Sequence, residues 1–186
     1  AAGVANLEDC CRACCAELGL EAPTFMRLPD QRLETIPQVD LNHLIEERVA
    51  AIRPEVVYCH HIGDMNRDHQ VLAESTLVAT RSKPGACVRR VLSFAVPSST
   101  DWMPAAAKTP FLPNWFVDIG DTIDQKLRAM AHYASETPPY PHPRSLEALR
   151  VFAQSWGSSA GVHFAEAFVL LRNLEVGRGQ AHEARV

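Results

Sequence analysis

Polar side chains that could carry chemistry are concentrated between residues 60 and 69. These ten positions hold three His, two Asp and one Asn, namely His60, His61, Asp64, Asn66, Asp68 and His69. Imidazole and carboxylate groups are the usual ligands of a catalytic metal of the zinc type, and they also act as general acids and bases. A lone His at the end of a strand is more often a hydrogen-bonded structural residue. From composition alone, a catalytic or metal-binding role and a structural role therefore both remain open.

A short apolar strand must deliver this cluster to its place in the fold. The run Val56-Val57-Tyr58 is β-branched and aromatic and follows Pro54, so we predict a buried strand over about 55–60. In α/β proteins, functional sites lie at the rim of the sheet where such strands end. Asp68 is expected to cap the next helix, whose apolar face extends through Ala79.

The remaining patterns predict an α/β chain. The expected order is helix, strand, helix, strand, helix, strand, Pro-rich loop, strand, helix, loop, helix, strand. Beyond the elements named above, the helices are expected up to Leu18, over 40–53, after a capping box of Thr122 with Gln125, and after a Ser145 cap, and the strands over 88–96, 116–119 and 167–171. Alternating strands and helices at this spacing predict a mostly parallel sheet covered on both faces. Such a chain normally opens with a strand, and here the opening strand is absent.

Bulk properties restrict the class of protein. A chain of 186 residues with 47% hydrophobic and 22% charged residues is expected to form one domain, 1–186, with a polar tail from about 177. The net charge of −4 gives no reason to expect a nucleic-acid partner. No apolar stretch approaches the roughly 20 residues of a membrane span, and we find no signal peptide. The sequence starts at Ala1 rather than Met, which is typical of an internal fragment, and it leaves a homo-oligomer open.

Four of the six cysteines form a CC-x-x-CC run at Cys10, Cys11, Cys14 and Cys15. On a helix, Cys10 and Cys14 are neighbours, as are Cys11 and Cys15. Two thiolate pairs could bind a metal, but no second Cys or His group follows at zinc-finger spacing. Because free Cys also packs as a small hydrophobe, a place in the core is the favoured interpretation. Reduced thiols indicate the cytoplasm.

The order of residues in the polar cluster resembles a known family. Tyr58-Cys59-His60-His61 followed by Asp64-x-Asn66-x-Asp68-His69 is similar to the H-H-x-x-D-x-N-x-D-H segment of the LmbE-like, or PIG-L, deacetylases. Further similar blocks follow in the same order and together cover most of residues 8–172: Leu28-Pro29-Asp30, the run from Val96 to Trp102, the run from Pro113 to Ile119, Ser135-Glu136, the run from Pro141 to Ser145, and Gly161 with the run from Ala165 to Phe168. The resemblance implies a Rossmann-like three-layer sandwich with a mostly parallel sheet. It also implies a zinc-dependent N-deacetylase that acts on N-acetylglucosamine-like amides, whether of a small sugar or a glycoconjugate.

The resemblance assigns roles within the cluster. His69 matches a metal ligand, the His of the D-H pair, and Asp68 matches a residue that supports the catalytic imidazole or its equivalent. Asn66 stands where many relatives have a His that steadies the oxyanion, so Asn66, His61 or another group is expected to take that role. Asp64 could orient the cluster.

A second candidate region is the Pro-bounded loop with His142 and Arg144. The guanidinium group of Arg144 could bind a substrate hydroxyl, phosphate or carboxylate. An ion pair of Arg144 with Glu136 or Glu147 that pins the loop is the alternative.

One departure from the family pattern matters most. The family's N-terminal H-P-D-D motif, which supplies two of the three metal ligands and the general base, occurs nowhere in this sequence. A strand–helix unit is therefore missing, and we expect this chain alone to be inactive. A non-catalytic carbohydrate- or partner-binding remnant of the family is the alternative, and a thiol-rich metal-binding or redox module is a third. Trp156 is a smaller departure, because relatives often have Arg there.

Overall fold

The computed structural model describes residues 2–175. Its helices and strands follow one another as α1 (Ala2–Glu17), the short 3-10 helix η1 (Leu33–Thr35), α2 (Gln38–Ile52), β1 (Val56–His60), α3 (Arg67–Ala79), β2 (Arg90–Phe94), β3 (Trp115–Asp118), α4 (Ile123–Ala131), the 3-10 helix η2 (Ala134–Glu136), α5 (Leu146–Ala160) and β4 (Ala165–Asn173). The α/β class expected from the sequence is confirmed. No helix within residues 2–175 combines the length and apolar character that a membrane span requires.

The four strands form one mixed sheet in the order β1-β2-β4-β3. β1 and β2 are parallel, whereas β4 runs antiparallel to both of its neighbours, β2 and β3. The expected mostly parallel arrangement thus holds for the β1–β2 pair alone. The reason lies in the connection from β3 to β4. It contains two helices, α4 and α5, and the second brings the chain back to the end of the sheet that it left, so that Asp118 at the end of β3 pairs with Ala165 at the start of β4.

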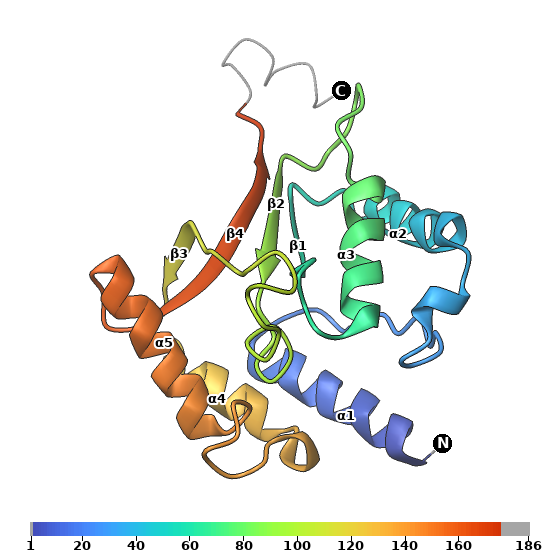
Figure 1. Ribbon diagram of the computed structural model, residues 1–186. Coiled ribbons are helices and arrows are strands. Elements are labelled where there is room, and N and C mark those ends of the chain that lie inside the picture. Colours follow the sequence, from blue (N-terminus) through green and yellow to red (C-terminus); the bar gives the residue numbers. More distant parts are fainter. Residues whose placement is uncertain (1, 176–186) are drawn as a thin grey trace.

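Two groups of helices flank the sheet (Figure 1). α3 packs on β1 and α2 packs on α3, while α5 packs on β4, α4 on α5, and α1 on α4. Val57, Cys59 and Val91 of the sheet lie against Val49 of α2 and Leu77 of α3. These contacts cover the sheet face that bears Val57 and Cys59. The three-layer sandwich that the resemblance implies stays a prediction.

The opposite face is more open over β1, at the edge of the sheet. Tyr58 keeps 52% exposure there, although its ring lies 5.3 Å from that of Phe168. Among the described residues, no strand pairs with the outer edge of β1. β1 is therefore an edge strand of the sheet that the described residues form.

Other details of the expected elements differ. The strand expected between the first two helices is replaced by coil and η1, because no neighbouring strand lies there, and Leu28 packs instead beside Leu33 and Leu41. The capping box at α4 does not form. The Thr122 hydroxyl lies 3.5 Å from the carbonyl of Ile119, and Gln125 donates to the carbonyl of Glu17 at 2.8 Å. The Ser145 cap is confirmed, since its hydroxyl accepts from the amide of Ala148 at 3.0 Å. The expected tail from about 177 lies outside the described residues.

Candidate functional site

The polar cluster lies at the rim where β1 and β2 end. His60 is the last residue of β1 and pairs with Phe94, the last residue of β2. The loop after β1 leads into α3, and the loop after β2 passes beside it (Figure 1). Because both parallel strands end at this rim, side chains from two loops and one helix converge there, as the sequence predicted for residues 60–69.

Asp64 is the centre of this cluster and has no solvent exposure. Its carboxylate accepts hydrogen bonds from the hydroxyls of Ser99 and Thr100, the latter at 2.5 Å, and from the amide of Asn66 at 2.7 Å. Burial alone would raise the pKa of this carboxyl group, but the contacts from His69, Ser99, Thr100 and the Asn66 amide outweigh it and hold the pKa well below its ordinary value. Asp64 is therefore a buried carboxylate whose charge is held by surrounding donors.

His69, in the first turn of α3, faces this carboxylate. Its Nδ1 lies 3.1 Å from Oδ1 of Asp64, within ion-pair distance but without the alignment of a hydrogen bond. Its ring stacks on that of His60, with centroids 4.1 Å apart and planes inclined by 19°. Burial, together with the neighbouring His69, lowers the pKa of His60 to about 4, against an opposing effect of Asp64. Two stacked imidazoles and one buried carboxylate thus form the core of the site.

Asn66 and Asp68 position the start of α3. The side chain of Asn66 caps the helix by accepting from the amide of Asp68 at 2.8 Å. The expectation that Asp68 would be the cap is wrong, because its carboxylate instead accepts from the amides of Gln31 and Leu33 at 2.7 and 3.0 Å. Asp68 therefore fastens a distant turn of the chain to α3, and it is almost completely buried in doing so.

His61 connects the cluster to the loop between β2 and β3. Its Nε2 lies 2.9 Å from the carbonyl oxygen of Thr109, and its ring meets that of Phe111 edge-on at 5.3 Å. His61, one of the predicted catalytic residues, thus has its Nε2 engaged with a backbone carbonyl. His61 also lines two pockets, one of about 1040 Å³ and one of about 240 Å³, so it lies between them.

His142 and Arg144 are not brought into this cluster. Arg144 pairs with Glu136 at 3.0 Å, which is the loop-pinning alternative that the sequence left open, and its amide donates to Nδ1 of His142 at 3.1 Å. Neither residue lines the larger pocket. The ring of His142 does lie 5.6 Å from that of Trp102, on the loop that borders the site.

The described residues do not form a complete metal site. Within residues 2–175, no group of three or more His, Cys, Asp or Glu side chains is arranged to hold a metal ion. The resemblance implies three ligands and assigns His69 as one of them, while the other two belong to the H-P-D-D motif that this sequence lacks. That assignment stays a prediction.

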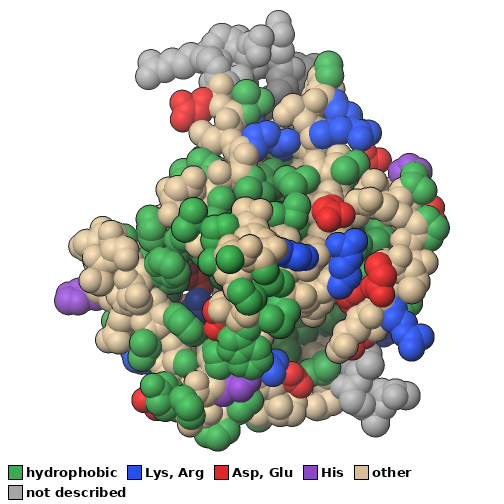
Figure 2. All heavy atoms as spheres, viewed as in Figure 1, with side chains coloured by type: hydrophobic (Ala, Val, Ile, Leu, Met, Phe, Trp, Pro, Cys, Tyr) green, Lys and Arg blue, Asp and Glu red, His purple; other side chains and the backbone are tan. Residues whose placement is uncertain are grey.

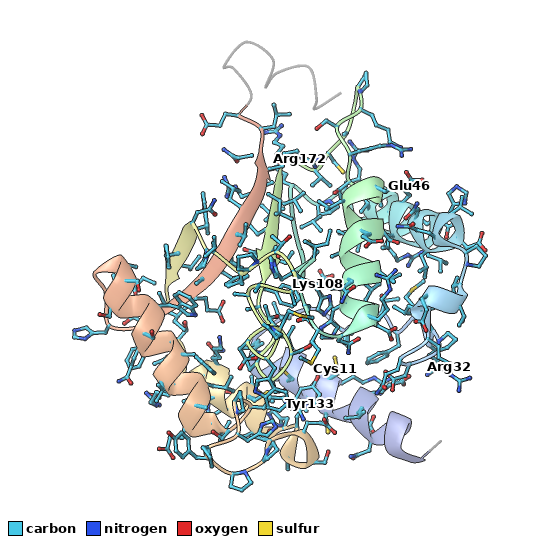
Figure 3. The ribbon with its side chains drawn as sticks, in the orientation of Figure 1. Cys11, Arg32, Glu46, Lys108, Tyr133 and Arg172 are labelled. Atoms are coloured by element: carbon cyan, nitrogen blue, oxygen red, sulfur yellow. The ribbon has the colours of Figure 1, made fainter. Side chains whose placement is uncertain are left out.

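The cysteine run of α1 faces the region after α4. Burial, and after it the neighbouring thiols of Cys11, Cys14 and Cys15, raises the pKa of Tyr133. Figure 3 shows Cys11 and Tyr133 on these two adjoining segments. All six cysteines are free, and those of α1 are half-buried. None of these four cysteines is fully buried or belongs to a core cluster of the described residues, so the place in the core that the sequence favoured is not confirmed.

Comparison with known proteins gives the family context. The family model PIG-L, described as GlcNAc-PI de-N-acetylase, matches this chain over residues 6–80, a stretch that includes the whole polar cluster. Residues 6–80 match the PIG-L family. The resemblance drawn from the sequence is therefore confirmed for this PIG-L stretch. No curated protein matches the chain in sequence.

Solved structures share the fold. The conserved protein TT1542 from Thermus thermophilus is 23% identical with a TM-score of 0.69, and the match covers 89% of this chain and 72% of that one. The N,N'-diacetylchitobiose deacetylase from Pyrococcus horikoshii is 16% identical with a TM-score of 0.65, covering 90% of this chain and 64%, less than two thirds, of that one. GalB, the 4-carboxy-2-hydroxymuconate hydratase from Pseudomonas putida KT2440, is 17% identical with a TM-score of 0.71, covering 92% and 73%. Because a deacetylase and a hydratase both share it, the fold does not choose the reaction.

The PIG-L stretch ends before two residues that contribute to the polar cluster. Ser99 and Thr100, which bind Asp64, lie beyond residue 80 and were not among the predicted site residues. A signal for them was present in the run from Val96 to Trp102, because polar residues directly after the second parallel strand must lie at the same rim. The turn that presents them contains Ser98 with φ of +66°, in the left-handed region, which a non-glycine residue rarely adopts.

Proposed function

We propose that this chain is part of a zinc-dependent N-deacetylase of the LmbE/PIG-L type, an amide hydrolase acting on an N-acetylglucosamine-like substrate. One observation carries the proposal: the buried Asp64 lies 3.1 Å from His69 at the rim of the sheet, inside the stretch that matches the PIG-L family. Hydrolysis of the acetamide would release acetate and a free amine. On this proposal residues 1–186 form one partial deacetylase domain.

His69 is proposed as the metal ligand that this chain contributes. Asp64 would fix the ring of His69 by facing its Nδ1, and the ring of His60 would hold it from one side. Orientation of a metal-binding imidazole by a carboxylate is a common second layer of such sites. The other protein ligands would come from residues outside this sequence, in an H-P-D-D segment. Without them we expect this chain to be inactive.

Other residues of the cluster have supporting roles in this proposal. Asn66 and Asp68 hold the first turn of α3, and so they position His69. Asn66 and His61 remain the candidates for a donor to the developing oxyanion, and we infer Asn66 to be the better one because Nε2 of His61 is engaged with Thr109. His142 and Arg144 remain proposed substrate-binding residues on the adjoining loop. The substrate would be a small N-acetylated sugar or glycoconjugate, and the six free cysteines support a cytoplasmic location.

A non-catalytic carbohydrate- or partner-binding remnant is the second candidate. It is favoured by the lack of a three-donor metal group within residues 2–175. The two candidates make different predictions about the DNA upstream of the Ala1 codon. An in-frame segment that encodes a strand ending in H-P-D-D supports the enzyme, and a start codon close to Ala1 supports the remnant.

The first test uses the 186-residue chain. We expect dialysis against zinc to leave much less than one ion per chain, and we expect no acetate release from N-acetylglucosamine. One bound zinc per chain together with turnover would contradict the proposed incompleteness of the site.

The second test uses the longer polypeptide, where the reading frame encodes one. It should bind one zinc and release acetate, and His69→Ala should abolish both. Exposed His43 in α2 offers a matched control, because His43→Ala should leave both unchanged. A long form that binds zinc and remains active with His69→Ala would refute the assignment of His69.

A further inference from the structure

A large pocket lies at the same rim as the polar cluster but has a different character. It measures about 1040 Å³ and is lined mainly by apolar side chains, with aromatic rings of Phe111, Phe152, Trp156 and Phe168 among them. Figure 2 shows hydrophobic side chains gathered over the middle of this face, around a hollow. Pockets of this size and lining are typical of small-molecule sites rather than of packing defects.

The wall of this pocket formed by residues 95–111 is fastened in place. The contact of His61 with the carbonyl oxygen of Thr109 fastens this wall to the loop after β1. Gly63 packs so closely against it that an added Cβ would lie 2.0 Å from the same carbonyl oxygen. Lys108, labelled in Figure 3, belongs to this loop and also lines the pocket. The pocket is therefore bounded by a positioned loop and not by a loosely placed one.

Helix α5 supplies the opposite wall, and Trp156 is its central side chain. The ring of Trp156 lies 6.4 Å from those of Phe111 and Phe116, at inclinations of 69° and 51°. The next residue, Gly157, lies so close to the carbonyl oxygens of Val162 and His163 that a Cβ would meet them at 2.7 Å. Close packing at Gly157 fixes the helix at this point, and with it the indole. Tilted and edge-on rings of this kind offer faces and edges that an additional flat aromatic ring can occupy.

One end of the pocket is polar and adjoins the candidate site. Thr100 lines the pocket and donates its hydroxyl hydrogen to Asp64 at 2.5 Å. His61 and Gly63 line the same end. The ion pair of Lys126 with Glu166 also lines the pocket, and its charges offset each other. Asp101 and Lys108 add one charge of each sign to the lining. A ligand that suits this lining has a polar head at Thr100 and an aromatic body without net charge beside Trp156.

We propose that this pocket binds an aromatic aglycone, carried by an N-acetylated sugar whose acetamide lies at the end lined by Thr100, His61 and Gly63. The inference rests on the proposed function for the identity of the polar head, but the aromatic subsite itself stands on the pocket. The expected substrates are aryl glycosides of an N-acetylamino sugar, which should bind more tightly than simple alkyl glycosides of the same sugar.

Three probes separate the two parts of this inference: 4-methylumbelliferyl N-acetyl-β-glucosaminide, methyl N-acetyl-β-glucosaminide and 4-methylumbelliferyl β-glucoside. By calorimetric titration of the 186-residue chain, we expect the first to bind at least tenfold more tightly than the second. Equal affinity of these two, or no binding of the aryl compound, overturns the aromatic subsite. If the two aryl compounds bind equally, the subsite stands and recognition of the acetamide, on which the proposed function rests, fails.

The location is tested in the unaltered protein through its four methionines. Met103 and Met130 line the pocket, whereas Met26 and Met65 are 42% and 47% exposed and do not line it. With ¹³C-methyl methionine labelling, the aryl probe should shift the signals of Met103 and Met130 and leave those of Met26 and Met65 in place. The opposite pattern overturns the proposal. So does a dimer, detected by light scattering, in which the Met103 signal does not respond to the probe, because a second copy would then close the pocket.

A pair of variants adds a second check. Trp156→Ser should remove the tenfold preference for the aryl sugar, while Trp102→Ser, at a residue that is 51% exposed and does not line the pocket, should keep it. If Trp156→Ser does not fold, Trp156→Phe, which retains an aromatic ring, should fold and keep most of the preference. Retention of the full preference by a folded Trp156→Ser chain refutes the role of the indole.

Discussion

The imidazole of His61 lies 2.9 Å from the carbonyl oxygen of Thr109, so a residue of the polar cluster holds a loop that begins 34 residues later, at Ala95. Removal of the ring would leave that carbonyl without its partner and would free the loop. We expect His61→Ala to lower the free energy of unfolding by about 1–3 kcal/mol. Urea denaturation measures this change, and hydrogen exchange should rise in residues 95–111. His43→Ala, at an exposed position of α2, should change stability by less than about 0.5 kcal/mol. A similar loss in both variants would mean that the contact has no special weight.

Gly63 makes the same junction sensitive to volume. An added Cβ would lie 2.0 Å from the Thr109 oxygen and 2.8 Å from Nε2 of His61, and a backbone oxygen has little freedom to move. We expect Gly63→Ala to cost about 2–3 kcal/mol, measured by thermal and urea unfolding. At Gly120 the nearest atom to an added Cβ is a side-chain oxygen of Asp118 at 3.2 Å. Gly120→Ala should therefore cost clearly less, and equal losses would contradict the packing argument.

Asp64 should be the most costly residue of the cluster to neutralise. Asn at this position would present an amide nitrogen to donors such as the Thr100 hydroxyl and the Asn66 amide. We expect Asp64→Asn to destabilise the fold by about 2–3 kcal/mol, since hydrogen bonds to a buried charged group are among the stronger ones. Asp101→Asn, at an exposed carboxyl group on the neighbouring loop, serves as the control. Unchanged stability of the Asp64 variant would show that its contacts contribute no net energy.

The pair of Glu8 with Arg27 predicts a dependence of stability on pH. Oε1 of Glu8 accepts a hydrogen bond from Nε of Arg27 at 2.9 Å, and this hydrogen bond lowers the pKa of Glu8 in the folded chain. The pair therefore stabilises the fold at pH values above the ordinary pKa of Glu, about 4.3, and that contribution is lost as the pH falls through the lowered value. We expect wild type to be more stable than Glu8→Gln at pH 6, with the gap closing toward pH 3. A gap between wild type and Glu8→Gln that stays constant with pH would refute the linkage.

The open edge of β1 predicts self-association. Its sequence carries no Lys or Pro to block strand addition, and Tyr58 is 52% exposed beside it. We expect the 186-residue chain to associate with rising concentration, measured by light scattering, and Tyr58→Lys to reduce this. Val39→Lys, at a residue of α2 that is 54% exposed, should leave association unchanged. If both variants reduce it equally, general surface hydrophobicity and not the strand edge is responsible.

Local patterns were sufficient to predict most elements of the fold. The strand at Val56–His60, the helices α2, α3 and α5, and the Ser145 cap follow from apolar periodicity and from short-range hydrogen bonding, which depend on neighbours a few residues apart. The capping box at Thr122 failed because Gln125 binds the carbonyl of Glu17, which is far away in sequence and close in the fold.

The sequence by itself determined that imidazoles and carboxylates gather after a strand, and that residues 6–80 resemble the PIG-L family. The tertiary structure alone decided what each of these groups does. Asp68 binds the amides of Gln31 and Leu33, and His61 holds Thr109, because the partners of a buried polar group are chosen by whichever chain segments pack beside it. The direction of β4 was likewise set by the pair of helices before it, a connection whose geometry no local pattern encodes.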